Sequence, residues 1–295
     1  FFYHPAKNRL VEIIPSSETS SETIQSVIQY CGAMGKVVIL CKDRPGFVVN
    51  RFFVPWLNEA CKLLDEGFGT PAEIDNVAKE CFDIGMGPFE LMNLTGPSIA
   101  LHSTDYLASQ LQVDRYKGAD SLRRLVEEGI QWDLAGASGD FSFKDRKEIR
   151  NRLLGVVLCI ASQIVEEEIC AMEDVDRGAK VGLRWPMGPF ELANDLGVDV
   201  AHGIASDYAV LAGFESPIIL SAQGSEPFKF KLIDLEVTNG VASITFNRPE
   251  AMNALNEEVI SQLTELWEGL EAEPSVHTAI LRGSGKAFVA GADIK

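Results

Sequence analysis

Basic residues are scarce in this sequence: 26 Lys and Arg stand against 43 Asp and Glu, which gives a net charge of −17. No basic stretch offsets this acidity, so we expect neither nucleic acid nor an anionic membrane surface as a partner. No apolar run is long enough to span a membrane, and no secretory leader is visible. The six cysteines form no C-x-x-C pair and the four histidines form no metal cluster. The composition therefore predicts a cytoplasmic protein without a metal site.

The first part of the chain predicts a β-α-β unit. Residues 10–14 and 36–41 are apolar enough for two buried parallel strands. Thr19 and Glu22 have the spacing of a capping box, and the helix that they begin is expected to run to about Met34. Three such elements cannot cover both faces of a parallel sheet. The segment is therefore expected to be the end of a larger α/β domain.

An internal repeat occupies the middle of the chain. The hexapeptide Met-Gly-Pro-Phe-Glu-Leu stands at 86–91 and again at 187–192, an offset of 101 positions. The same offset relates further identical pairs: Asn50 and Asn151, Arg51 and Arg152, Asp75 and Asp176, and Ala78 and Ala179. This repeat predicts two copies of one helical unit. The Gly- and Ser-rich residues 136–140 predict a linker between the copies.

Both hexapeptides predict a helix start. Proline loses no hydrogen bond in the first turn of a helix, and the glutamate that follows suits the positive end of the helix dipole. Nothing near either hexapeptide supplies a nucleophile or a base, so a structural role is favoured over a catalytic one. Packing between the repeats, or contact between subunits, is the expected purpose.

The last part of the chain changes to alternating strands. Asn239 and Gly240 are a strong hairpin signal between two stretches of period two. The two strands are predicted at residues 232–237 and 241–246. Asn256 can cap a helix that ends near Leu270, and residues 278–282 predict a third strand. This pattern is typical of the beginning of a second α/β domain.

Three motifs in this order resemble the 3-hydroxyacyl-CoA dehydrogenases: FFYHPAKNRLVEIIP, KDRPGFVVNRF and GMGPFELMNLTG. A match without gaps implies that the family's catalytic histidine would stand immediately before Phe1, with Glu12 as the carboxylate that orients its imidazole. The resemblance also implies that Asn50 binds the β-oxygen of the substrate and that NAD is the cofactor, although the chain has no G-x-G-x-x-G loop.

The same residues have plainer interpretations without the resemblance. An edge-strand glutamate that faces water would then be the favoured interpretation of Glu12. Asn50 would be as well explained by a residue that satisfies backbone groups at a helix start. Its repeat partner Asn151 is expected to be structural.

Two further motifs, FNRPEAMNALNEEVI and GKAFVAGADIK, resemble the crotonase superfamily, which includes the enoyl-CoA hydratases. That superfamily directs two backbone N–H groups at the thioester oxygen, where enolate charge develops. The resemblance places the first of these groups at Ala292, and the small residues Ala290 and Gly291 would let coenzyme A approach the backbone. The same resemblance implies further substrate contacts from Lys286, Asp293, Ile294 and Lys295. For the two lysines, solvated surface residues are the alternative.

The resemblances together imply a mainly α fold. A duplicated helical dehydrogenase C-terminal domain would be flanked by the α/β end of a Rossmann domain and the α/β start of a crotonase domain. The expected boundaries are residues 1–42, 43–140, 146–225 and 229–295.

We thus expect an incomplete fragment of a fused β-oxidation enzyme. The parent would hydrate an enoyl-CoA and oxidise the resulting 3-hydroxyacyl-CoA with NAD, whereas the fragment alone is expected to be inactive. Two alternatives stay open: a non-catalytic helical dimerisation module, and a dehydrogenase fused to an enoyl-CoA isomerase. The expected partners are the acyl-CoA substrate, a coenzyme A thioester, and a second copy of the chain in a homo-oligomer formed through the helical domains.

Overall fold

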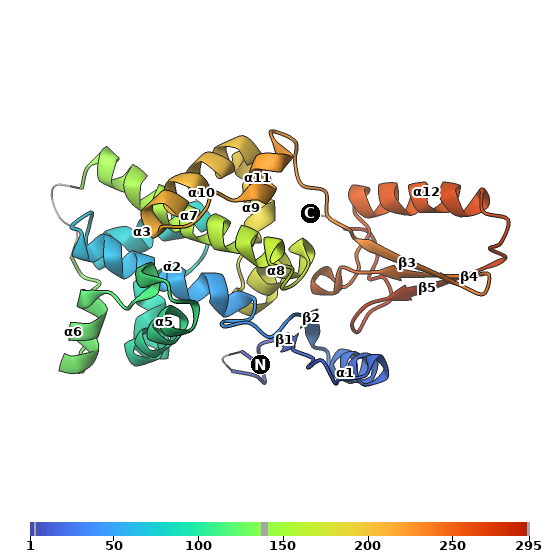
Figure 1. Cartoon of the computed structure of the whole chain (residues 1–295), viewed down its shortest axis with the longest axis horizontal. Coiled ribbons are helices and arrows are strands. Elements are labelled where there is room, and N and C mark those ends of the chain that lie inside the picture. The colour runs from blue at the N-terminus through green and yellow to red at the C-terminus, as the bar shows by residue number, and fades with distance from the viewer. Residues whose placement is uncertain (3, 137–140, 294–295) are drawn as a thin grey trace. The chain divides into compact units, whose positions relative to one another are not determined.

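The repeat of the sequence reappears as two successive sets of helices in the computed structural model, which describes residues 1–2, 4–136 and 141–293 (Figure 1). Both sets lie in one compact unit, residues 41–228. The first set is α2 (Val49–Asp65), α3 (Pro71–Phe82), α4 (Pro88–Thr95), α5 (Pro97–Leu111), the 3-10 turn η1 (Asp114–Tyr116) and α6 (Asp120–Glu128). The second is α7 (Phe143–Glu166), α8 (Met172–Gly178), the π-helical turn η2 (Ala179–Leu183), α9 (Pro189–Leu196), α10 (Val198–Ala212) and α11 (Ile218–Gln223). The predicted duplication is thus confirmed in the helices.

Helices α2 and α7 pack against each other within this unit. Arg51, near the start of α2, pairs with Glu167 just after α7, at 2.5 Å. Arg152, in the first half of α7, pairs in turn with Glu66 just after α2. These two pairs are related by the repeat offset, so each copy gives an arginine to the equivalent glutamate of the other. The contact is therefore reciprocal, and the two helices run antiparallel.

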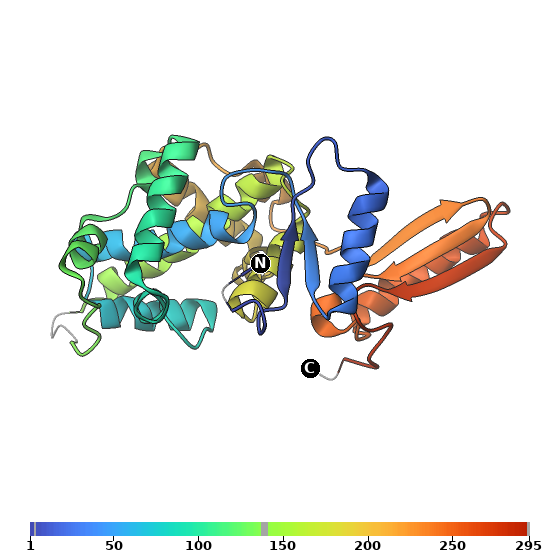
Figure 2. The same ribbon diagram turned by 90° about the horizontal axis from the view of Figure 1, so that it is seen from below.

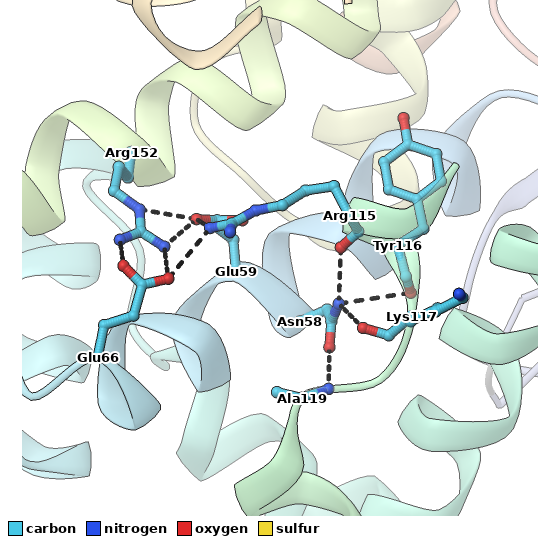
Figure 3. Close-up of polar contacts among 8 residues, drawn as sticks. All are labelled: Asn58, Glu59, Glu66, Arg115, Tyr116, Lys117, Ala119 and Arg152. Carbon is cyan, nitrogen blue, oxygen red and sulfur yellow. Dashed lines mark hydrogen bonds and ion pairs between the residues drawn. The ribbon is translucent and has the colours of Figure 1, made fainter. Parts of the chain in front are cut away.

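A buried carboxylate strengthens one side of this contact (Figure 3). Glu59 of α2 is only 1% exposed, and Arg152 donates to it from Nε at 2.7 Å and from Nη2 at 2.5 Å. Arg115 of η1 also donates to Glu59, from Nε at 3.0 Å. Burial by itself would lower the pKa of both guanidinium groups, but the charges and hydrogen bonds of Glu59 and Glu66 outweigh it and raise both. Three helical segments are thereby fixed to one carboxylate.

The neighbouring residue Asn58 orders the chain that leads from η1 to α6. Its side-chain amide donates to the carbonyl oxygen of Lys117 at 3.0 Å, and its Oδ1 accepts from the backbone N–H of Ala119 at 3.0 Å (Figure 3). Asn58 is 1% exposed, so these bonds satisfy a polar side chain that is removed from water.

Residues 1–40 and 229–295 form the other unit. Its first segment contains β1 (Leu10–Ile13), α1 (Ser21–Ala33) and β2 (Val37–Leu40), with the two strands parallel as predicted. The predicted capping box of Thr19 and Glu22 is wrong, because Ser20 is the N-cap and its hydroxyl accepts from Thr23 N–H at 3.1 Å. Thr19 instead accepts from the backbone of Ser16 at 3.1 Å, within the turn that precedes the helix.

The second segment confirms the predicted hairpin and the strand that follows it. Strand β3 (Ile233–Thr238) is antiparallel to β4 (Val241–Phe246), which is parallel to β5 (Thr278–Gly283). Asn239 and Gly240 both have positive φ, 51° and 76°, as a type I′ turn requires. Between β4 and β5 come the 3-10 turn η3 (Pro249–Ala251) and α12 (Glu257–Glu271), which lies on one face of the strands (Figure 2). Asn256 caps α12 through a bond from Val259 N–H, as expected.

The predicted domain limits stay a prediction, because the two compact units do not separate 43–140 from 146–225. Of the predicted linker, residues 137–140 lie outside the described part of the chain. Among the residues that the structure describes, no helix has both the length and the apolarity to cross a bilayer.

Replacing Glu59 by Gln should destabilise the helical unit strongly. Two buried guanidinium groups would then lose their shared anion, and breaking a buried ion pair from one side lowers the free energy of unfolding by about 3–5 kcal/mol. Glu66→Gln is the matched control: its half-exposed side chain binds the same Arg152, and solvent screening limits its effect to about 1 kcal/mol. Urea unfolding followed by circular dichroism measures both. Equal effects of the two variants would show that Glu59 has no special role.

Candidate functional site

A tight turn precedes α2 and places the first candidate residue. Lys42 N–H donates to Ile169 O at 2.9 Å, and Phe47 N–H donates to Arg44 O at 2.8 Å, which closes the turn around Pro45 and Gly46. Gly46 has φ of 81°. A Cβ at Gly46 would lie 2.9 Å from the Cα of Arg51, so the turn can lie directly against the start of α2 only with glycine at this position.

A cleft opens between this turn and helix α5. Its volume is about 540 Å³. The turn side supplies Asp43, Arg44, Pro45, Gly46 and Phe47; α2 supplies Asn50 and Val54; and α5 supplies His102, Ser103, Tyr106, Leu107 and Gln110. His102, Tyr106 and Gln110 recur at every fourth position and so share one face of the helix. They were not identified from the sequence: their spacing indicates a shared helix face, but only the folded chain places that face at the cleft.

Asn50 stands in this cleft with its amide available. The residue is exposed on the first turn of α2, and among the described residues its side chain makes no hydrogen bond. The alternative role, satisfying backbone groups at a helix start, therefore has no bond to support it. An amide in this position can donate to an oxygen atom of a bound ligand.

The second repeat fills the corresponding positions differently. Asn151 lies inside α7, and its Oδ1 accepts from Arg150 at 3.4 Å. Where the first repeat has Val54 and Leu107, the second has Gly155 and Tyr208. Tyr208 is 1% exposed, and a Cβ at Gly155 would lie 2.7 Å from its Cβ. The tyrosine thus packs directly against the α7 backbone.

Glu12 lies on β1 beside Ile39 of β2 and is half-buried. Glu12 thus lies within a strand of a parallel pair, as expected. Glu12 and Asn50 belong to different compact units. Their joint action in one active site stays a prediction.

The predicted oxyanion residue Ala292 lies on an extended segment beside Leu255. Leu255 N–H donates to Gly291 O at 2.9 Å, and Asp293 N–H donates to Leu255 O at 2.8 Å. In this parallel pairing the N–H of Ala292 points away from Leu255, and no described residue accepts from it. A backbone donor of this kind is what a thioester oxygen would require.

The other predicted substrate contacts lie near Ala292 in the sequence. Ala290 and Gly291 are exposed, and Lys286 is exposed in the turn after β5. The carboxylate of Asp293 accepts from Arg248 at 3.2 Å, which fixes the segment and engages that side chain. Ile294 and Lys295 lie outside the described residues.

Asn253 holds the loop of Ala292 in place and was missed from the sequence. It is 1% exposed and donates to the carbonyl oxygens of Ser284 at 2.9 Å and Ala287 at 2.8 Å. Its own Oδ1 accepts from Arg248 N–H at 2.8 Å. Because Asn tolerates the left-handed conformation that Asn253 adopts, with φ of 55°, one residue joins the turn after β4 to the turn after β5.

The two hexapeptides are structural, as favoured from the sequence, and each is held within its own repeat. Asp75 accepts from the N–H groups of Phe89 at 2.8 Å and Glu90 at 2.9 Å. Asp176 accepts in the same way from Phe190 and Glu191, each at 2.8 Å. Both carboxylates therefore bind the free N–H groups at the start of a helix, while packing between the repeats, or contact between subunits, stays a prediction for these segments.

Both carboxyl groups are buried, which raises their pKa values. Burial is the main cause at Asp75, where the pKa is raised from 3.8 to about 6 and the two N–H bonds oppose the rise. The pKa of Asp176 is raised from 3.8 to about 8, again by burial first and then by the charge of Glu191.

Three family models match the chain. The model for the C-terminal domain of 3-hydroxyacyl-CoA dehydrogenase matches residues 46–136 and 149–224, more than half of the chain and both helical repeats. The chain belongs to the 3-hydroxyacyl-CoA dehydrogenase family. The model for the NAD-binding domain of the same dehydrogenases matches residues 1–44, and the enoyl-CoA hydratase/isomerase model matches residues 236–295. The resemblances drawn from the motifs are confirmed for each segment.

Individual relatives support the same assignment. A probable 3-hydroxybutyryl-CoA dehydrogenase of Deinococcus radiodurans is 35% identical over 136 residues, which are 46% of this chain and 48% of that protein. The fatty acid oxidation complex subunit alpha of Aliivibrio fischeri is 30% identical over 235 residues, 71% of this chain and 34% of that protein. The chain thus spans about half the length, or less, of the curated relatives that it matches.

A solved structure shows the fold. The crystal structure of 3-hydroxybutyryl-CoA dehydrogenase from Escherichia coli K12 has a TM-score of 0.64 and 17% sequence identity, and the match covers 75% of this chain and 69% of that one. The mainly α fold class expected from the sequence is confirmed.

The pH dependence of stability should depend on Asp176. A raised carboxyl pKa means that the folded state keeps a proton that the unfolded state has lost, so stability falls as the pH rises toward about 8. The fall amounts to at most about 1.4 kcal/mol per pH unit. Asp176→Asn should therefore flatten the urea midpoints measured between pH 6 and pH 8. Asp75→Asn, whose parent carboxyl has a pKa of about 6 and so has lost most of its proton above pH 7, should leave the slope between pH 7 and pH 8 unchanged. An unaltered slope in Asp176→Asn would contradict the prediction.

Proposed function

We propose that this chain is part of an enzyme that oxidises 3-hydroxyacyl-CoA to 3-ketoacyl-CoA with NAD and also acts on enoyl-CoA. The observation that carries the dehydrogenase half is Asn50: its amide is available in a cleft of the first repeat, whereas Asn151 lies within a helix and the second repeat packs that space with Tyr208. A fold that needed the asparagine for packing alone would treat the two copies alike.

The chemistry assigns a role to each proposed residue. Oxidation of a 3-hydroxyl group requires a base for its proton, and Glu12 would orient an imidazole supplied by the family's preceding histidine. Asn50 would donate to the 3-oxygen and hold the carbon for hydride loss. NAD accepts that hydride when it is bound. The parallel β1-α1-β2 segment fits part of a dinucleotide-binding domain, but this sequence contains no glycine-rich phosphate loop, so no NAD-binding residues are assigned.

The second proposed activity is hydration of an enoyl-CoA. The available N–H of Ala292 supports it, because enolate charge on the thioester oxygen needs a backbone donor. Lys286, exposed in the turn after β5, would meet the phosphates of coenzyme A. The matching family model includes isomerases as well as hydratases, so the fused isomerase remains the alternative.

A purely structural role for the helices is the second candidate function. The reciprocal pairs Arg51–Glu167 and Arg152–Glu66 favour it, because they show two equivalent helices that bury each other within one chain. Homo-oligomer formation through the helical domains is retained as a proposal, with a face other than this one as the contact. A cytoplasmic location is also a proposal, and it is supported only by the scattered cysteines, which are typical of a reducing compartment.

Residues 1–295 alone should show negligible dehydrogenase and hydratase activity. The NAD-binding family model matches only residues 1–44, and crotonase similarity covers only 236–295. The check is NADH formation at 340 nm with 3-hydroxybutyryl-CoA, and loss of absorbance with crotonyl-CoA. Turnover of either substrate by the purified chain would overturn this prediction.

A chimera tests the dehydrogenase proposal and the role of Asn50. Residues 1–228 would replace the corresponding part of a 3-hydroxybutyryl-CoA dehydrogenase, from the strand equivalent to β1 onward. The chimera should oxidise 3-hydroxybutyryl-CoA, and Asn50→Ala should lower kcat/KM by about 10²-fold, as removal of one positioned donor does. Asn151→Ala is the matched control and should change kcat/KM little. A folded chimera without activity, or equal losses in both variants, would contradict the proposal.

A further inference from the structure

Phe47 has a backbone conformation that its side chain disfavours. Its φ is 48°, in the left-handed region that bulky residues rarely adopt. Several other described residues with positive φ are polar and end a helix, such as Asp83, Gln112 and Arg184. Strain of this kind persists where the surroundings impose it, and it is often found at binding sites.

The helical fold itself does not require this conformation. In the second repeat, the positions equivalent to residues 43–48 are residues 144–149, and all of them lie inside α7. Glu148 stands where the first repeat has Phe47. One copy therefore has helix at these positions, whereas the other reaches α2 through a strained turn.

The turn before α2 brings an aromatic ring to the cleft. Phe47 is half-buried and lines the cleft together with Val54 and Leu107, while Asn50 stands at the same cleft with its available amide. An apolar surface beside a hydrogen-bond donor suits a ligand whose hydrocarbon chain adjoins an oxygen-bearing carbon. The acyl part of a 3-hydroxyacyl or 3-ketoacyl thioester has this chemistry.

We propose that Phe47 is a substrate-binding residue whose ring contacts the acyl chain, and that the strained turn exists to present this ring beside Asn50. The inference rests on the proposed dehydrogenase function. It assigns to Phe47 a contribution to acyl binding, whereas Asn50 binds the 3-oxygen.

The experiment compares the affinities of acetoacetyl-CoA and free coenzyme A for the full chain, by isothermal titration calorimetry. Phe47→Gly should weaken acetoacetyl-CoA binding about tenfold, which is about 1.4 kcal/mol, and leave coenzyme A binding unchanged. The same variant relieves the strained φ but loses the apolar contacts of the half-buried ring, so the thermal midpoint should change by less than about 2–4 °C. Phe47→Tyr, which keeps the ring, should restore acetoacetyl-CoA binding.

Asp83→Gly is the matched control for strain, because Asp83 is exposed and has φ of 51° at the end of α3. It should raise the midpoint and leave both affinities unchanged. If Asn50→Ala weakens acetoacetyl-CoA binding and Phe47→Gly does not, this inference alone is overturned. If the unaltered chain binds acetoacetyl-CoA no better than coenzyme A, the inference and acyl binding in this cleft both fail. A midpoint in Phe47→Gly lowered by much more than about 4 °C would show that the ring serves packing of the fold, and would also overturn the inference.

Discussion

The carboxylate of Glu59, buried between Arg115 and Arg152, is the constraint on which the helical unit depends. A charge removed from water needs partners that surround it, and here those partners come from η1 and from the other repeat. The carboxylate therefore sets where α7 lies along α2 and where the chain returns after α5. Because α5 forms one wall of the cleft, this network also fixes the distance between that wall and Asn50.

The duplication explains how a site can arise in only one of two equivalent copies. Both repeats keep the contacts that stabilise the fold. Within each repeat a carboxylate binds the start of α4 or α9, and between the repeats reciprocal arginine pairs join α2 and α7. They differ where the long helix begins and in the side chains that fill the space beside it. In the first copy a turn at Pro45 and Gly46 precedes α2 and lines a cleft, whereas in the second these positions are already helical and Tyr208 packs against Gly155. The comparison separates what the fold needs from what a ligand would use.

Buried carboxylates have two different roles in this chain. Asp75 and Asp176 are surrounded by backbone N–H groups at helix starts, and burial dominates their pKa values. Glu59 has guanidinium groups instead, and the ion pairs there raise the pKa of the arginines. The same carboxylate group thus stabilises helix ends in one case and the packing of one helix on another in the second. Neither set lies where the cleft or Ala292 would place a substrate.

The sequence by itself determined the order of elements, the repeat, the hairpin at Asn239 and Gly240, and the segments that match each family, because turn residues and apolar periodicity act over a few positions. It also pointed to Asn50 and Ala292, through motifs. Only the tertiary structure decided that Ser20 rather than Thr19 caps α1, that Glu59 joins the repeats, and that His102 and Tyr106 lie beside Asn50. The choice of cap depends on competition between two neighbouring hydroxyl groups, and the other two outcomes depend on contacts between residues far apart in the chain. A local sequence pattern predicts neither.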